Sequence, residues 1–257
     1  MSTLAIRDTT TMLRRNLRHV QRFPLMSIGT IGMPVVMMLL FVHVFGGSLG
    51  ATLVAGVSYV DYLVPGILVM AVGSGAAWTA VNMCTDMGEG IVARFRTMAI
   101  SRYSVLTGQA LSSLLNTACS LALVLGVAVL TGFRPAADLG GWLAAAGLLV
   151  LLTLAFTWLA IGFGLAAKTP AGANTSSIPL QFLPFVSSAF VPTDSMSSGL
   201  RWVAEHQPFT PIIDTLRGLL VGTPIGDSGY WAVGWCLLLT AVGYAWSRAL
   251  FNRGPSR

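Results

Sequence analysis

Charged residues are scarce in this chain of 257 residues. Only 9% of them are Asp, Glu, Lys or Arg, whereas a soluble domain carries about 25%. Apolar residues make up 54% of the sequence, and a surface with so few ionic groups cannot stay dispersed in water. The composition therefore excludes a soluble globular protein and predicts an integral membrane protein.

Lysine and cysteine are also rare. Lys168 is the single lysine, and the three cysteines stand in or beside separate apolar runs without a CxxC pair. This pattern argues against a disulfide framework or a zinc site, and we interpret the cysteines as small apolar helix residues. The net charge of +6 comes from arginines at the ends of apolar runs, which indicates membrane topology rather than nucleic-acid binding.

Six stretches that contain no charged residue are long enough to cross a bilayer, which takes about 20 residues. They predict an all-α polytopic protein, a single transmembrane domain over residues 1–257. We expect its helices at about 26–46, 62–84, 108–131, 141–167, 176–193 and 229–248. The fifth contains Pro179, Pro184 and several serines. Such a helix is tolerated only where neighbouring helices satisfy the freed backbone groups, so we expect it inside a bundle.

The basic residues predict the orientation of these helices. With the amino terminus in the cytoplasm, only Arg134, Arg201 and Arg217 face outward, and the other 12 of the 15 Lys and Arg residues face the cytoplasm. This asymmetry follows the positive-inside rule. We therefore expect both termini to be cytoplasmic.

Two segments are neither spans nor plain loops. Residues 1–24 predict an interfacial helix, because a helical wheel of residues 4–22 separates the apolar side chains from five arginines. Residues 194–227 form the longest external connection, and its apolar part contains Asp214 and Arg217. Two charges are costly in lipid, so we expect a re-entrant segment rather than a seventh span.

Two short motifs are similar to known functional sequences, but their context does not predict the corresponding activity. Gly162–Thr169 approximates a phosphate-binding loop, but Ala167 replaces the second glycine and the stretch ends an apolar helix. Because Lys168 is the only lysine, no other Walker A sequence is possible. Gly46–Gly50 fits the G-x-S-x-G pattern without the strand that a hydrolase requires. We expect no catalytic, cofactor or metal site in this chain.

The predicted membrane cores contain no Asp, Glu, Lys or Arg. Ion-driven transporters generally place such residues at membrane depth. A pump with this sequence would need a partner subunit as its energy source.

The first cytoplasmic loop is more specific. Residues 86–102 read Asp-Met-Gly-Glu-Gly-Ile-Val-Ala-Arg-Phe-Arg-Thr-Met-Ala-Ile-Ser-Arg and predict an amphipathic helix suited to docking on a soluble protein. The stretch resembles the segment after the second span in type-2 ATP-binding-cassette (ABC) export permeases, notably their daunorubicin-resistance branch. Glu89, Gly90, Ser101 and Arg102 match that pattern, and Ala99 stands where the family often has proline.

A second stretch carries the same resemblance. Phe190 and Pro192 match the family's fifth-helix motif, Gln207-Pro208 its external motif, and Asp214 with Arg217 the D-x-x-R that follows. The resemblance implies that residues 86–102 couple to an ATPase through Glu89, Gly90, Arg94, Phe95, Arg96 and Arg102. It also implies an external re-entrant motif made of Pro192, Pro208, Asp214 and Arg217.

The resemblance further implies a transport permease of a bacterial plasma membrane that is not itself an enzyme. Two copies, as a homodimer or a heterodimer, would pair with two copies of a separate ABC ATPase subunit that binds Mg-ATP. The cargo would be a hydrophobic or amphipathic molecule, such as a drug, an antibiotic or a lipid-like compound, because the predicted path is uncharged.

Two alternatives remain open at this point. An intramembrane enzyme acting on lipids or peptides would need a polar catalytic cluster at membrane depth. An assembly factor for a cell-envelope complex would show no cargo-dependent ATP hydrolysis in a reconstituted complex.

Overall fold

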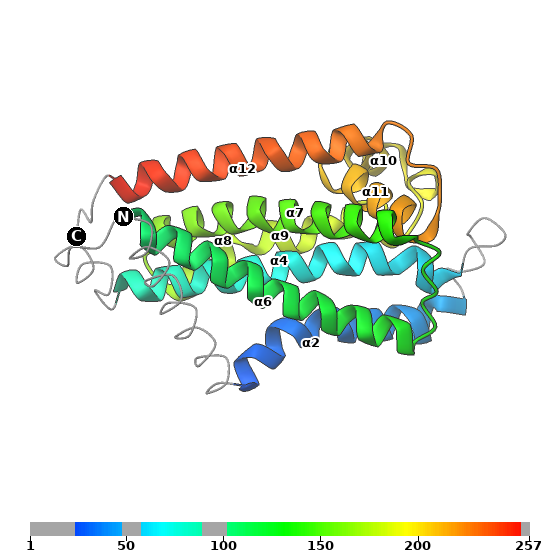
Figure 1. Cartoon of the computed structure of the whole chain (residues 1–257), viewed down its shortest axis with the longest axis horizontal. Coiled ribbons are helices and arrows are strands. Elements are labelled where there is room, and N and C mark those ends of the chain that lie inside the picture. Colours follow the sequence, from blue (N-terminus) through cyan, green and yellow to red (C-terminus); the bar gives the residue numbers. More distant parts are fainter. Residues whose placement is uncertain (1–23, 48–57, 89–101, 253–257) are drawn as a thin grey trace.

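The computed structural model describes residues 24–47, 58–88 and 102–252, and every regular element in these ranges is a helix (Figure 1). Nearly all of the expected interfacial helix, residues 1–24, lies outside these ranges. So does most of the expected coupling segment, including Glu89, Gly90, Arg94, Phe95 and Arg96.

Long helices form the body of the protein. They are α2 (Pro24–Leu40) with the π-helix η1 (Phe41–Phe45), α4 (Tyr59–Gly88), α6 (Arg102–Leu130), α7 (Leu139–Ala166) and α12 (Ser228–Asn252). Shorter elements lie between α7 and α12. These are α8 (Pro170–Ser176), α9 (Ile178–Phe182), η2 (Leu183–Val186), η3 (Thr193–Ser195), α10 (Ser198–His206) and α11 (Phe209–Val221).

Four helices are long and apolar enough to cross a membrane. They are α4, α6 from Leu106 onward, α7 and α12, with 25 to 30 residues each. At about 1.5 Å of rise per residue, each exceeds the roughly 30 Å thickness of a bilayer core. A shorter apolar helical stretch covers Gly32–Phe45. The protein is thus an all-α polytopic membrane protein, and its long helices lie near five of the six expected positions.

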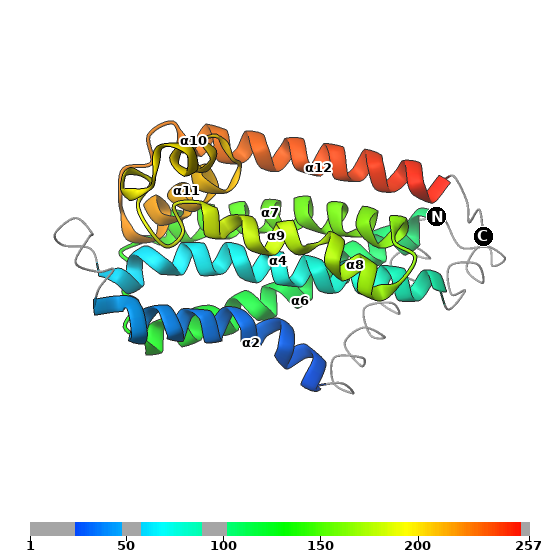
Figure 2. The same ribbon diagram turned by 180° about the vertical axis from the view of Figure 1, so that it is seen from behind.

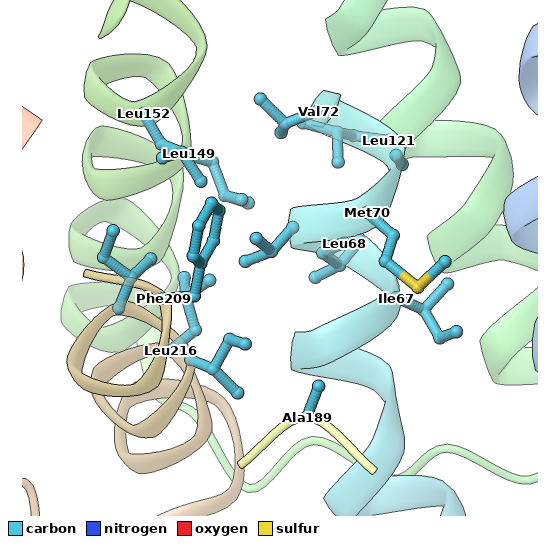
Figure 3. Close-up of a cluster of buried hydrophobic side chains, with 14 of the residues drawn as sticks. Ile67, Leu68, Met70, Val72, Leu121, Leu149, Leu152, Ala189, Phe209 and Leu216 are labelled. Atoms are coloured by element: carbon cyan, nitrogen blue, oxygen red, sulfur yellow. The ribbon is translucent and has the colours of Figure 1, made fainter. Parts of the chain in front are cut away.

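Helix α4 is the centre of the bundle. In its most apolar window 83% of the residues are buried, against 17% in α12. Figure 3 shows side chains of α7 and α11, including Leu149 and Phe209, on one side of α4 and Leu121 of α6 on the other. Because α4 is covered by protein on several faces, its hydrophobic residues form core rather than lipid surface.

A chain of hydroxyl groups links three of the long helices. Ser113 of α6 lies 2.8 Å from the Thr79 hydroxyl of α4 and 2.9 Å from the Thr157 hydroxyl of α7. All three residues are buried. Hydrogen bonds between polar side chains join helices where lipid offers no competing partner, so this network holds α4, α6 and α7 together.

The segment expected to form the fifth crossing differs from the continuous helix expected over 176–193. It begins earlier, at Pro170, and is divided into α8, α9 and η2. The cause is local, because Pro179 and Pro184 have no N–H to donate to the carbonyls of Thr175 and Leu180. The prolines therefore break the helix that the apolar run alone predicts.

Close contact with α4 supports this broken segment, as the two views of the fold indicate (Figures 1 and 2). A Cβ atom at Gly73 would collide with the carbonyl oxygen of Leu180, and one at Gly66 would lie 2.6 Å from the Cβ of Ala189. Only glycine permits this approach. It brings the α4 backbone against the carbonyl that Pro184 leaves without its helical donor.

Candidate functional site

The most connected polar group among the described residues lies at the end of the bundle where α11 packs. Asp214 and Arg217 lie three residues apart on α11, so one turn of helix presents both on the same face. Helix α11 has 13 residues and ends at Val221, and the following Gly222 adopts a left-handed conformation with φ 87°. At roughly 20 Å, the helix is too short to cross the membrane.

Arg217 is paired and buried. Its Nη1 lies 2.6 Å from Oδ1 of Asp214, and only 8% of the arginine side chain is exposed, against 36% for the aspartate. A buried guanidinium needs partners for its other N–H groups, since an unpaired charge is costly away from water.

Two backbone carbonyls supply these partners. Nη2 of Arg217 donates to the carbonyl of Ser188 at 2.7 Å, and Nε donates to the carbonyl of Tyr62 at 3.3 Å. The Ser188 hydroxyl donates to Oδ1 of Asp214 at 2.7 Å. The guanidinium carbon also lies 3.8 Å from the centroid of the Tyr62 ring, a cation–π contact. We call these four residues the outer junction.

The outer junction connects three parts of the fold. Tyr62 belongs to α4, Ser188 follows the broken fifth segment, and the ion pair belongs to α11. Because Arg217 donates to main-chain carbonyls of the first two parts, a displacement of either would break a charge-assisted hydrogen bond. The arrangement can thus hold the outer ends of α4 and the fifth segment in one relative position.

Other residues of the matched motifs lie at the starts of neighbouring helices. Pro208 directly precedes α11, and Gln207 before it donates from Nε2 to the carbonyl of Val186 at 2.6 Å. Pro192 directly precedes η3, and its carbonyl accepts a hydrogen bond from the Ser195 hydroxyl at 2.7 Å. Asp214 and Arg217 therefore form a direct ion pair, and each of the two prolines stands immediately before a helix.

Of the expected coupling residues, one lies in the described part of the chain. Arg102 begins α6, and the other five lie outside the described residues. Their contact with an ATPase stays a prediction.

The sequence did not reveal two members of the outer junction. Ser188 lies within a matched motif but at one of its variable positions, and Tyr62 begins a charge-free stretch far from Arg217. No local pattern marks a tyrosine whose carbonyl and ring receive a distant arginine. Only the fold brings them together.

Comparison with known proteins agrees with this architecture. Residues 7–221 match the family model described as ABC-2 type transporter. A daunorubicin resistance ABC transporter permease protein of Streptomyces coeruleorubidus is 31% identical over 241 residues, which cover 92% of this chain and 82% of the relative. A probable doxorubicin resistance ABC transporter permease protein of Mycobacterium tuberculosis is 24% identical over 248 residues, covering 94% of this chain and 89% of the relative.

The helical bundle and the matched motifs together define a multi-pass transport permease. More particularly, the chain belongs to the ABC-2 type transporter family, as the match over residues 7–221 and the similarity to the daunorubicin resistance permease show. The resemblance drawn from residues 86–102 and from the D-x-x-R motif is confirmed.

Proposed function

We propose that two copies of this chain, with two copies of a separate ABC ATPase that binds Mg-ATP, form an exporter of the bacterial plasma membrane. Both termini face the cytoplasm. The exporter moves a hydrophobic or amphipathic compound, drug-like or lipid-like, out of the cell. The relatives named for daunorubicin and doxorubicin resistance support a drug as cargo.

The positions of the charged residues in the spans are the main support for this proposal. In the described spans, Asp, Glu, Lys and Arg occur only near helix ends, at Asp61, Asp86, Arg102 and Arg248. A transporter driven by protons or sodium uses ionisable residues at membrane depth. A permease built this way takes its energy from a partner, and its family supplies ABC ATPases for that role.

The exposed face of the fifth segment supports an amphipathic cargo. Asn174, Thr175 and Ser176 of α8 are exposed, as are Ile178 and Phe182 of α9. Amide and hydroxyl groups are poorly suited to lipid and are usually placed toward protein or a water-filled cavity. We therefore assign this face to a cavity between the two copies, where polar groups and an aromatic ring meet the cargo.

ATP-dependent accumulation of daunorubicin in inverted membrane vesicles tests the proposal. The vesicles contain this chain and a separate ABC ATPase subunit expressed with it. We expect accumulation that requires both proteins and ATP. Glu89→Gln or Arg96→Ala should abolish accumulation and co-purification of the ATPase, because both residues belong to the expected coupling segment.

A matched control uses Asp227→Asn, which removes an exposed carboxylate before α12 on the external side. This variant should bind the ATPase and accumulate daunorubicin as the wild type does. Unchanged ATPase binding and transport in both coupling variants would overturn the assigned role of residues 86–102. Daunorubicin accumulation without the ATPase would overturn the energy source.

A further inference from the structure

Helix α6 contacts the rest of the bundle through few residues. In its most apolar window only 28% of the residues are buried, against 83% in α4. Its exposed face is apolar and includes Leu111, Leu115 and Leu123. Its buried face contains four hydroxyl groups, those of Ser112, Ser113, Thr117 and Ser120. Because a buried polar group needs a partner where water is excluded, the partners of these hydroxyls decide how α6 packs.

Two of the four hydroxyls have no protein partner. Ser112 and Ser120 are 9% and 4% exposed, and the Oγ atom of each has no hydrogen-bond partner among the described residues. A hydroxyl in a membrane helix commonly donates to the carbonyl four residues earlier, as Thr153 of α7 does to Leu149 at 2.7 Å. Neither serine makes this bond, so each hydroxyl is directed to another group.

A half-buried amide lies between the two serines. Asn116 follows Ser112 by four residues and precedes Ser120 by four, so the three side chains form one row along α6. Neighbours in such a row have Cβ atoms about 5 to 6 Å apart. A direct hydrogen bond between short side chains needs a donor–acceptor distance of about 2.9 Å. One water molecule between two neighbours of the row can bond to both.

The row continues in one direction only. Gln109 is half-buried and precedes Ser112 by three residues, so it extends the row toward Arg102 at the start of α6. In the other direction Leu123 follows Ser120 by three residues and is 54% exposed, which ends the row with an apolar side chain. Water can therefore reach the row from the Arg102 end of the helix.

We propose that α6 carries a water-binding row, with one water molecule between Ser112 and Asn116 and a second between Asn116 and Ser120. A serine hydroxyl can donate and accept, and the amide of Asn116 has two N–H donors and an acceptor oxygen. Each water thus finds both kinds of partner. Buried water in proteins usually bonds to polar groups that would otherwise lack a partner. The row is independent of the cargo and of the ATPase.

A structure that resolves ordered water tests the row. The full chain, in lipid nanodiscs and enlarged by a bound antibody fragment, is studied by electron cryomicroscopy. We expect two water peaks, each within about 3.2 Å of polar atoms of two row residues. Hydroxyls that bond to the carbonyls of Gly108 and Asn116, with no water peak, would overturn the proposal. An acyl chain over the row would overturn it too.

Two variants assign the peaks to their residues. Asn116→Leu keeps the size of the side chain and removes the amide, so both peaks should disappear. Ser120→Ala should remove only the peak between positions 116 and 120, and it serves as the test if Asn116→Leu does not fold. Peaks that persist in the variants would show that these side chains do not hold the water, and the proposal would be wrong.

Thermal unfolding gives an independent test with an opposite sign for the two possibilities. If water joins Ser120 to Asn116, Ser120→Ala removes a bonded group and should lower the unfolding temperature by about 2 to 4 °C. If the hydroxyl is dry and unpartnered, its removal relieves the cost of a buried polar group. An unchanged or higher unfolding temperature would therefore overturn the proposal. Cys119→Ala, at the neighbouring exposed position, is the control and should change nothing.

Discussion

The guanidinium of Arg217 lies over the ring of Tyr62, 3.8 Å from its centroid, and donates to the carbonyl of the same residue. The two residues are 155 positions apart in the sequence. One side chain of the short helix α11 thereby holds one end of the central helix α4. This contact makes the D-x-x-R motif a structural connection between α11 and a membrane span.

Removing the guanidinium should destabilise the outer junction. Arg217→Gln leaves the carbonyls of Tyr62 and Ser188 without their donor and Asp214 without its pair. We expect a loss of about 2 kcal/mol, because two carbonyls lose a charged donor and the partly exposed Asp214 loses its partner. Thermal unfolding of the purified permease in detergent measures this loss of stability.

Two further variants separate charge from geometry. Arg217→Lys keeps the charge but loses the planar fork, so it should recover only part of the stability. Arg134→Ala removes an exposed arginine and should leave the unfolding temperature unchanged. Equal stability of Arg217→Gln and the wild type would contradict the role assigned to the outer junction.

Gly73 should be intolerant of any side chain. Gly73→Ala places a methyl group against the Leu180 carbonyl, and displacing packed backbone costs about 1 to 3 kcal/mol. The expected result is a lower unfolding temperature and less protein in the membrane. Gly126→Ala on the open surface of α6, where a Cβ has no atom within 4 Å, should show neither effect.

A hydroxyl of the network between helices should contribute more to the free energy of unfolding than a hydroxyl that bonds within its own helix. Thr157→Val removes a link between α7 and α6 and should cost about 0.6 kcal/mol, the average for such bonds in a membrane protein. Thr240→Val removes a bond to the Cys236 carbonyl four residues earlier and should cost less. Equilibrium unfolding of both variants gives the comparison, and a larger loss for Thr240→Val would contradict it.

Phe182 should affect transport more than folding. Its ring is 50% exposed and stacks on Phe185 at 5.7 Å, so Phe182→Ala uncovers little of the core. We expect a several-fold higher KM for daunorubicin with unchanged ATPase binding. Leu237→Ala, on the exposed surface of α12, is the control. A KM that moves equally in both variants would remove Phe182 from the transport path.

The orientation can be tested with two matched cysteines. A Cβ at Gly88 or at Gly199 has open space around it, so cysteine fits at either position. In a Cys119→Ala background, a membrane-impermeant maleimide should label Gly199→Cys in intact cells. It should reach Gly88→Cys only after lysis, because positive charge retains that side in the cytoplasm. The reverse pattern would invert the topology.

The sequence by itself determined the membrane class, the places of the long helices and the family. An apolar run of about 20 residues is a property of neighbouring positions, which explains why α7 and α12 lie near their expected ranges. Residues 86–102 and the pair Asp214 and Arg217 identified the family for the same reason, because their signal is local spacing.

Only the tertiary structure decided how polar groups in apolar surroundings are satisfied. Pro184 interrupts the fifth segment, and the close packing of the Leu180 carbonyl is possible only because Gly73, which is distant in sequence, has no side chain. Arg217 likewise takes its acceptors from Tyr62 and Ser188. Where water is excluded, each buried polar group needs a partner from elsewhere in the fold. The local sequence pattern does not indicate which residue that partner is.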